Sequence, residues 1–261
     1  MIRLEAAQAT DRGRRREINE DSVLAEEGLF AVADGLGGHQ GGEVASALAV
    51  ETLAAQIQQA RTQDRRHRFA RRPQRASCPT IEDLLRAVDR ANEEILAKSA
   101  TSPELAGMGT TLCALAVVTH EHHPALAVVN VGDSRVYRCD DLGFHQITED
   151  HTVVQEMVKA GILDWDEAES HSYRHHLSRA LGIKSRVVVD DWTLAAVRGH
   201  RYLLCSDGLT NEVDDRDIHA ILLNCESPAQ AVGALVSRAL QNGGSDNVTV
   251  VVVDVADVDL P

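Results

Sequence analysis

Residues 110–148, TTLCALAVVTHEHHPALAVVNVGDSRVYRCDDLGFHQIT, decide the fold of this chain. They hold four short β-rich runs, and polar turns of a few residues separate one run from the next. No crossover helix fits between the runs, so we expect them to pair as an antiparallel meander. Because helical segments lie outside this meander in the sequence, the chain is predicted to be an α+β protein built in layers.

The composition is that of a globular protein. The chain has 261 residues, 44% of them apolar and 25% charged, which is enough for one large domain or at most two. It contains no apolar run long enough to span a membrane, and its first residues do not resemble a secretion signal. The five cysteines are scattered and form no CxxC pair, so we expect reduced thiols and a cytoplasmic location.

The charge of the chain bears on its partners. A formal net charge of −14 argues against general binding of nucleic acid. Residues 61–75 oppose this trend, because they contain seven arginines and one aspartate. This basic segment is either a solvated loop, which we favour, or a dock for acidic or phosphorylated partners.

Further strands and helices are predicted on both sides of the meander. Thr80, with Asp83 three residues later, resembles the N-cap of a helix, and Pro228 suits the first turn of another. Residues 150–182 are polar, rich in histidine and only weakly helical. The predicted helices are residues 43–60, 80–100 and 227–241, and the predicted strands lie within residues 22–34, 192–197, 202–206 and 247–255.

Four aspartates stand where an apolar strand meets a loop: Asp34, Asp133, Asp207 and Asp246. Each is next to a small or polar residue, and each by itself is explained by turn chemistry. If the four converge, their charges repel one another unless cations lie between them. Mg²⁺ and Mn²⁺ prefer oxygen ligands, and two such ions roughly 3.5–4 Å apart can promote attack on a phosphoryl group. The pattern therefore favours a metal-assisted phosphoryl hydrolase.

A cluster of charges near the N-terminus fits the same chemistry. In RRREINEDS, Arg16 precedes Glu20 by four residues and Asp21 by five. One interpretation is a surface salt-bridge cluster. In the functional interpretation, the Arg16 guanidinium binds a phosphate with two hydrogen bonds, and the Glu20 carboxylate holds a water beside a metal ion.

Taken together, eight segments resemble one known family. These segments occur in an order that resembles that of the metal-dependent protein phosphatases, and more narrowly that of the bacterial type 2C Ser/Thr phosphatases. The resemblance extends from about residue 10 to 255. The resemblance implies a four-layer αββα sandwich that forms a single domain over residues 1–261. It also implies a flap subdomain at about 150–182 and a basic insertion between two helices at about 61–79. The segments are RGRRREINEDS, FAVADGLGGHQGGEVAS, GMGTT, VVNVGDSRVYR, ITEDHTVVQEMVKAGIL, HLSRALG, YLLCSDGLTNEV and GGSDNVTVVVV.

The resemblance also implies roles for the four acids. Asp34 resembles the carboxylate that bridges two catalytic Mn²⁺ or Mg²⁺ ions, and Gly35 resembles the residue whose carbonyl joins one of them. Asp207 and Asp246 match the carboxylate ligands of the other ion. Asp133, together with Asp207, matches the site of a third and weaker ion in bacterial members.

The implied reaction is hydrolysis of phosphoserine or phosphothreonine on proteins, by direct attack of a water that bridges the metals and without a phosphoenzyme. Arg16 matches the arginine that binds phosphate, and Glu20 and Asp21 match the acids around metal-bound water. Many eukaryotic members have a histidine, a candidate general acid, at the position where this chain has Leu36. The nearest histidine in this chain is His39. The identity of the general acid is therefore open.

The resemblance sets the expected partners as well. They are phosphorylated proteins, among them a bacterial Ser/Thr kinase and its targets, and we expect a monomer that binds neither nucleic acid nor a membrane. Two alternatives are a catalytically inactive member that binds phosphoproteins and a hydrolase of another phosphoester, such as a nuclease. Asn247 is expected to support the site rather than to bind metal.

Overall fold

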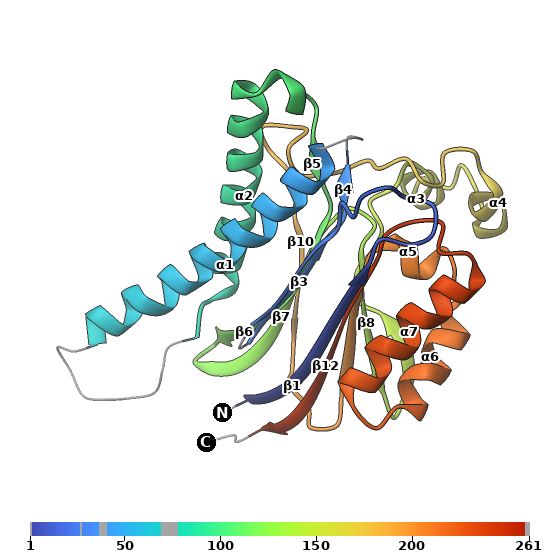
Figure 1. The fold of residues 1–261 in the computed structure, drawn as a ribbon. Helices are drawn as coiled ribbons and strands as arrows, with labels where there is room; N and C mark the ends of the chain where they lie inside the picture. Colours follow the sequence, from blue (N-terminus) through green and yellow to red (C-terminus); the bar gives the residue numbers. More distant parts are fainter. Residues whose placement is uncertain (1, 27, 37–40, 69–77, 259–261) are drawn as a thin grey trace.

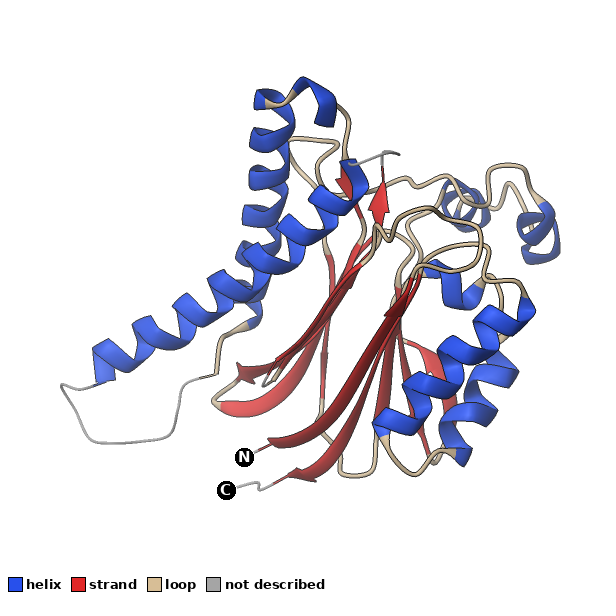
Figure 2. Cartoon of the chain, in the orientation of Figure 1, coloured by secondary structure: helices blue, strands red, loops and turns tan. Residues whose placement is uncertain are grey.

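Two antiparallel sheets of five strands pack face to face, and helices cover the outer face of each sheet (Figure 1; Figure 2). The computed structural model describes residues 2–26, 28–36, 41–68 and 78–258, without the side chains of 63–68 and 169. This arrangement confirms the predicted α+β class and the four-layer αββα sandwich.

Each sheet is named after one of its inner strands. The β12 sheet runs in the order β1 (Ile2–Asp11), β12 (Val248–Val258), β11 (Arg201–Cys205), β8 (Arg135–Asp140), β9 (Gly143–Gln146). The β6 sheet runs in the order β10 (Asp190–Leu194), β7 (His123–Val131), β6 (Leu112–His120), β3 (Leu29–Ala33), β2 (Ser22–Glu26). A small third sheet pairs β4 (Gly35–Leu36) with β5 (Gly109–Thr110).

The helices divide between the two outer faces and one end of the sandwich. Helices α1 (Gly41–Arg68) and α2 (Ile81–Thr101) cover the β6 sheet, and a 3₁₀ turn at Pro103–Leu105 follows them. Helices α5 (Asp207–Thr210), α6 (Asp215–Asn224) and α7 (Pro228–Asn242) lie on the side of the β12 sheet. Helices α3 (Val153–Lys159) and α4 (Trp165–Ser170) lie to one side of the upper end in Figure 1.

The alternation of side chains along each strand builds the layers. In β3, Leu29, Ala31 and Ala33 pack with the residues of α1 and α2. Phe30 and Val32 point the other way and join the core between the two sheets. Strand β12 follows the same rule, with one set of valines facing the helices and the other facing the β6 sheet. Because both faces are buried, these strands read as continuous apolar runs.

One prediction about the opening stretch is wrong. Its four runs form strands β6, β7, β8 and β9, but they do not pair as a single meander. Strands β6 and β7 form a hairpin in the β6 sheet, whereas β8 and β9 form a hairpin in the β12 sheet. The short link at residues 132–134 carries the chain across the sandwich, and the strands β7 and β8 on its two sides each bury apolar residues on both faces.

Other boundaries also differ from the expectation. Helix α1 continues to Arg68, so the first half of the basic segment is helical rather than a loop. Residues 69–77 lie outside the described residues, as does His39. Strand β1 and helix α6 were not predicted, while the helices at 80–100 and 227–241 are confirmed within two residues. None of the described helices is long and apolar enough to cross a membrane.

The start of α2 offers a test of local stability. The Thr80 hydroxyl accepts a hydrogen bond from the Asp83 amide, and the Asp83 carboxylate accepts one from the Thr80 amide, as a capping box does. We expect Thr80→Ala to lower the free energy of unfolding by about 1 kcal/mol, measured by urea denaturation. Thr80→Ser keeps the hydroxyl and serves as the control; equal losses in both variants would contradict the capping role.

Candidate functional site

The topology brings the ends of four strands to one end of the sandwich. Strands β3 and β7 both pair antiparallel with β6, so they run in the same direction and end at the same edge. Asp34 and Asp133 follow these two strands. Strands β11 and β12 are antiparallel, so Asp207, after β11, lies at the same edge as Asp246, before β12. Each sheet thus supplies two carboxylates.

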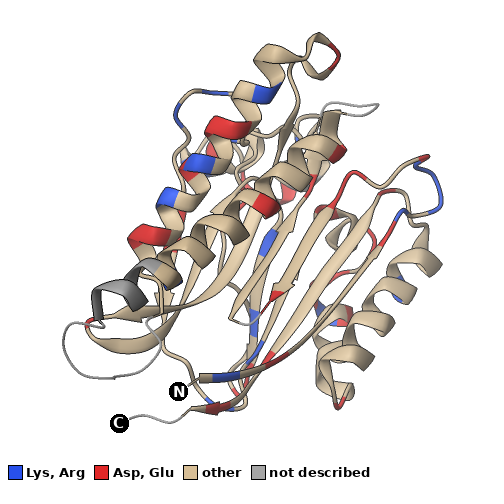
Figure 3. Ribbon diagram, turned by 60° about the vertical axis from the view of Figure 1, so that its left-hand side comes forward, with Lys and Arg blue, Asp and Glu red and all other residues tan. Residues whose placement is uncertain are grey.

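These carboxylates line a single pocket of about 630 Å³, which we call the acidic pocket. Figure 3 shows acidic positions gathered in the loops at this end of the strands. Of the predicted residues, only Asp21 is absent from the lining, and it is buried beside it with its carboxylate bonded to Ser206. The lining consists of Arg16, Glu20, Asp34, Gly35, Leu36, Asp133, Arg174, His175, Leu177, Asp207, Asn211, Ser245, Asp246 and Asn247.

The backbone of Asp34 is held by two threonines, which leaves its carboxylate for the pocket. The Asp34 amide donates to the Thr111 hydroxyl at 2.9 Å, and the Thr110 hydroxyl donates to the Asp34 carbonyl at 2.8 Å. The Thr111 hydroxyl also lies 2.7 Å from that of Ser134, the neighbour of Asp133. Thr111 therefore couples the ends of β3 and β7.

Two glycines beside the acids are required by close packing. A Cβ atom at Gly35 would overlap the carbonyl oxygens of Gly42 and Glu20. A Cβ atom at Gly208 would overlap the carbonyl oxygen of Asn247. These contacts let the segments that carry Asp34 and Asp207 pack directly against neighbouring backbone at the pocket.

The segment that carries Arg16 and Glu20 is tied to the pocket by Asn247. The Asn247 amide group donates to the carbonyls of Arg12 and Ile18, both at 2.9 Å, and its side-chain oxygen accepts from the Glu20 amide at 2.8 Å. Arg16 itself bonds the Asp246 carboxylate at 2.6 Å, and this bond is the largest cause of its raised pKa. About half of the Arg16 side chain stays exposed at the pocket.

Burial and mutual repulsion make the carboxylates of the site resist ionisation. Burial is the largest cause of the raised pKa of Asp34, and the charges of Asp21 and Asp207 come next. Burial likewise raises the pKa of Asp133 to about 8, with the charge of Asp207 as the second cause. The pKa of Asp207 is also raised, first by burial and then by Asp246. Cations placed among these groups would relieve that repulsion.

The chemistry of the site fits a divalent cation such as Mn²⁺ or Mg²⁺. The residues predicted to bind metal offer oxygen ligands, and three buried carboxylate oxygens of the site, Glu20 Oε1, Asp21 Oδ1 and Asp207 Oδ1, accept no hydrogen bond. Among the described residues, however, no three His, Cys, Asp or Glu side chains form a ready-made metal cage. Asp246 is paired with Arg16 instead.

Residues 170–182 contribute to the pocket in a way that the sequence did not indicate. Arg174, His175 and Leu177 line it, and the charge of His175 partly offsets the rise in the pKa of Asp207. No spacing or motif distinguishes these three from the other polar and apolar residues around them. His151 is instead buried, and its Nδ1 atom accepts a hydrogen bond from the Gly132 amide.

Comparison with known proteins agrees with this geometry. Residues 12–242 match the family model described as Protein phosphatase 2C. The chain belongs to the protein phosphatase 2C family. It is 40% identical to the serine/threonine protein phosphatase PstP of Mycobacterium tuberculosis over 98% of its length, but it spans only 46% of that relative. It is also 34% identical to the serine/threonine phosphatase stp of Listeria monocytogenes, and that alignment covers 94% of this chain and 93% of the relative.

Solved structures of the protein phosphatase 2C family share the fold. The crystal structure of the M. tuberculosis phosphatase PstP has a TM-score of 0.84 and 38% identity, and the alignment covers 97% of this chain and 99% of that one. The catalytic domain of PstP in complex with two manganese ions has a TM-score of 0.78 and 39% identity, with the same coverage. That relative shows that the family's fold holds two such ions.

Proposed function

We propose that this chain hydrolyses phosphoserine and phosphothreonine on proteins with the aid of Mn²⁺ or Mg²⁺, and that it opposes a bacterial Ser/Thr kinase. The observation that carries this proposal is the convergence of Asp34, Asp133, Asp207 and Asp246 with Arg16 in one pocket. The names of the relatives as serine/threonine phosphatases support it. We further propose that the chain acts as a monomer in the cytoplasm, as one catalytic domain with residues 150–182 as its flap.

The four aspartates would hold the ions in this proposal. Asp34 would hold both ions, with the help of the Gly35 carbonyl, and Asp207 and Asp246 would complete the pair of sites; all four residues line the acidic pocket. Asp133 and Asp207 are assigned a third, weaker site. When bound, the ions would stabilise charge on the phosphoryl oxygens and lower the pKa of water.

The remaining polar groups would orient the substrate. The Arg16 guanidinium, half exposed at the pocket, can donate two hydrogen bonds to the oxygens of the phosphoryl group. The carboxylates of Glu20 and Asp21 are buried, and each has an oxygen without a donor, so they can accept hydrogen bonds from water at the site. Asn247 keeps the Arg16 segment in place through its three backbone contacts.

The basic segment does not favour a nuclease or a dock beside the site. Helix α1 begins beside the small β4 sheet, and its 28 residues place Arg68 roughly 40 Å from that start. The described part of the segment, residues 61–68, therefore lies at the far end of α1 (Figure 1). Any partner that it binds would contact the enzyme far from the reacting phosphate.

Release of phosphate from a phosphothreonine peptide tests the proposal. We expect turnover with Mn²⁺ and its loss in EDTA, with recovery when Mn²⁺ is added back, because the acidic pocket alone repels a phosphate anion. Turnover of the same peptide in EDTA at the rate seen with Mn²⁺ would contradict the metal dependence. A single-stranded oligonucleotide serves as the comparison substrate, and its preferred cleavage would favour a nuclease instead.

A further inference from the structure

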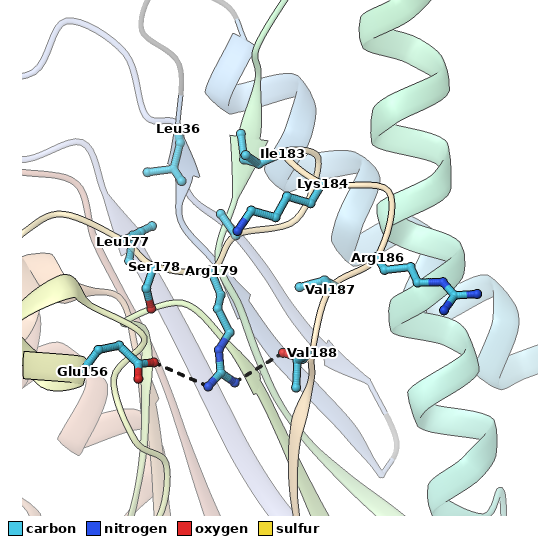
Figure 4. A pocket seen from close by; sticks show the side chains of 11 residues that line it. Leu36, Glu156, Leu177, Ser178, Arg179, Ile183, Lys184, Arg186, Val187 and Val188 are labelled. Atoms are coloured by element: carbon cyan, nitrogen blue, oxygen red, sulfur yellow. Dashed lines mark hydrogen bonds and ion pairs between the residues drawn. The ribbon is translucent and has the colours of Figure 1, made fainter. Parts of the chain in front are cut away.

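A second pocket adjoins the acidic pocket and differs from it in chemistry. It has a volume of about 390 Å³, and we call it the flanking pocket. Leu36 and Leu177 line both pockets, so they form the boundary between the two. The other members of the lining that carry the argument are Ile183, Lys184, Val187 and Val188 (Figure 4). A molecule that fills both pockets must therefore pass over these two leucines.

The walls of the flanking pocket are braced from two directions. On α2, the buried Asn92 side chain accepts a hydrogen bond from the Gly182 amide at 2.8 Å and donates one to the Lys184 carbonyl at 3.0 Å. Across the pocket, Arg179 bonds Asp190 at 2.6 Å and lies 3.6 Å from Glu156 of α3. The pocket is therefore formed before any ligand arrives, which lowers the entropy cost of binding.

The charges of the pocket favour an anionic ligand. The Arg179 charge is already compensated by Asp190 and Glu156, so it is not available to a ligand. Lys184 has no ion-pair partner among the described residues, and in Figure 4 its ammonium extends toward Leu36 and Arg179. The Arg186 guanidinium points away from them, toward α2 (Figure 4). In a chain of net charge −14, Lys184 is thus a cation beside the pocket that forms no ion pair with any residue the structure describes.

The apolar part of the lining is exposed and contiguous with that cation. Ile183 is 52% exposed and Val188 is 67% exposed, and both are large aliphatic side chains in one short segment. Aliphatic side chains beside a free ammonium suit a peptide segment that carries one acidic and one aliphatic residue. Because the pocket borders the acidic pocket, that segment would be continuous with the residue whose phosphate is bound there.

We propose that the flanking pocket binds the acidic and aliphatic residues next to the phosphorylated residue of a protein substrate. Lys184 contacts the acidic side chain, and Ile183 and Val188 contact the aliphatic one. This inference rests on the proposed phosphatase activity and names the class of sequence that the enzyme prefers. Lys184 and Ile183 are thus specificity residues that do not contact the reacting phosphorus.

Paired phosphothreonine peptides test the proposal on the full chain loaded with Mn²⁺. One peptide has an Asp and a Leu next to the phosphothreonine on each side. The other peptide has Ser in place of each Asp and Ala in place of each Leu. We expect the ratio of kcat/KM between the first and the second to be about tenfold, the size of one hydrogen bond to a charged group. Lys184→Glu should reduce this ratio to one or below, and Ile183→Ser should reduce it by a smaller factor.

Matched variants at the opposite end of the sandwich control for net charge and surface polarity. Arg198 and Val197 lie in the exposed turn between β10 and β11, so Arg198→Glu and Val197→Ser should leave the ratio unchanged. An equal fall in Lys184→Glu and Arg198→Glu would overturn the proposal, as would a wild-type ratio of one. A wild-type dimer that Ile183→Ser separates would also overturn it, because a second copy would then cover the pocket.

The proposed activity is tested separately by p-nitrophenyl phosphate, which is too small to reach the flanking pocket. Its turnover by the wild-type protein together with a peptide ratio of one would overturn only the sequence preference. No turnover of this compound or of either peptide would overturn both the phosphatase activity and the preference that rests on it.

Discussion

Asp34→Asn is expected to lower kcat/KM for a phosphothreonine peptide by at least about a thousandfold, which corresponds to about 4 kcal/mol of transition-state stabilisation. The two threonines that position Asp34 bond its backbone, so asparagine keeps those contacts. What the variant loses is the negative charge that is proposed to hold both ions. The loss should therefore appear in kcat, with the fold unchanged.

The stability of the same variant separates a loss of charge from a loss of structure. Burial and neighbouring acids raise the pKa of the Asp34 carboxyl in the folded protein. At a pH above the pKa that Asp34 has in the unfolded chain, the native state therefore binds more protons than the unfolded state. The stability of the wild-type protein in EDTA therefore falls as the pH rises through the folded pKa. Asp34→Asn removes this repulsion, so its melting temperature in EDTA at pH 8 should exceed that of the wild type.

Added Mn²⁺ should reverse this order. It should stabilise the wild type by about 2.7 kcal/mol at a hundred times its dissociation constant, and stabilise Asp34→Asn much less. Asp257→Asn, at an exposed position near the other end of β12, is the control and should match the wild type in all three measurements. Full activity of Asp34→Asn with an unchanged response to Mn²⁺ would contradict the assignment of Asp34 as a ligand.

The position of the acids could be predicted from the sequence because it depends on a local sequence pattern, an aspartate at the end of an apolar strand. Asp34, Asp133 and Asp207 each end an apolar strand, and Asp246 precedes one, whatever the partners of those strands are. The long strands β6 and β7 separate Asp34 from Asp133, and the four strands β8 to β11 separate Asp133 from Asp207. Because each number is even, the chain returns to the same end of the sandwich, and the acids converge even though the predicted meander is wrong. The convergence needed only the strand directions, not the strand order.

The strand partners themselves could not be predicted. Strands buried on both faces carry no alternation to show which sheet they join, so the crossing at residues 132–134 leaves no signal. The edge strand β1 could not be predicted either, for the opposite reason. Its sequence IRLEAAQATD alternates only between exposed and half-buried residues, with little of the β-branched character that marks a strand. Arg174 and His175 reach the acidic pocket through tertiary packing alone.

Asn247→Ala is expected to cost about 3 kcal/mol of unfolding free energy and to lower kcat/KM about a hundredfold, because it leaves three backbone groups without their partner. These groups are the carbonyls of Arg12 and Ile18 and the amide of Glu20, and the Asn247 side chain is buried among them. The segment between them carries Arg16, so its displacement removes the guanidinium from the phosphoryl group.

Two further variants divide this effect into its parts. Asn224→Ala removes one exposed hydrogen bond within α6, so its unfolding free energy should stay within about 0.5 kcal/mol of the wild type. Arg16→Ala should lose activity without the loss of stability, because among the described residues the Arg16 side chain bonds only the half-buried Asp246. In the double variant, the activity losses should not add, since Asn247 acts on catalysis through the placement of Arg16. Fully additive losses would instead mean that Asn247 acts on the site by a separate route, through its neighbour Asp246.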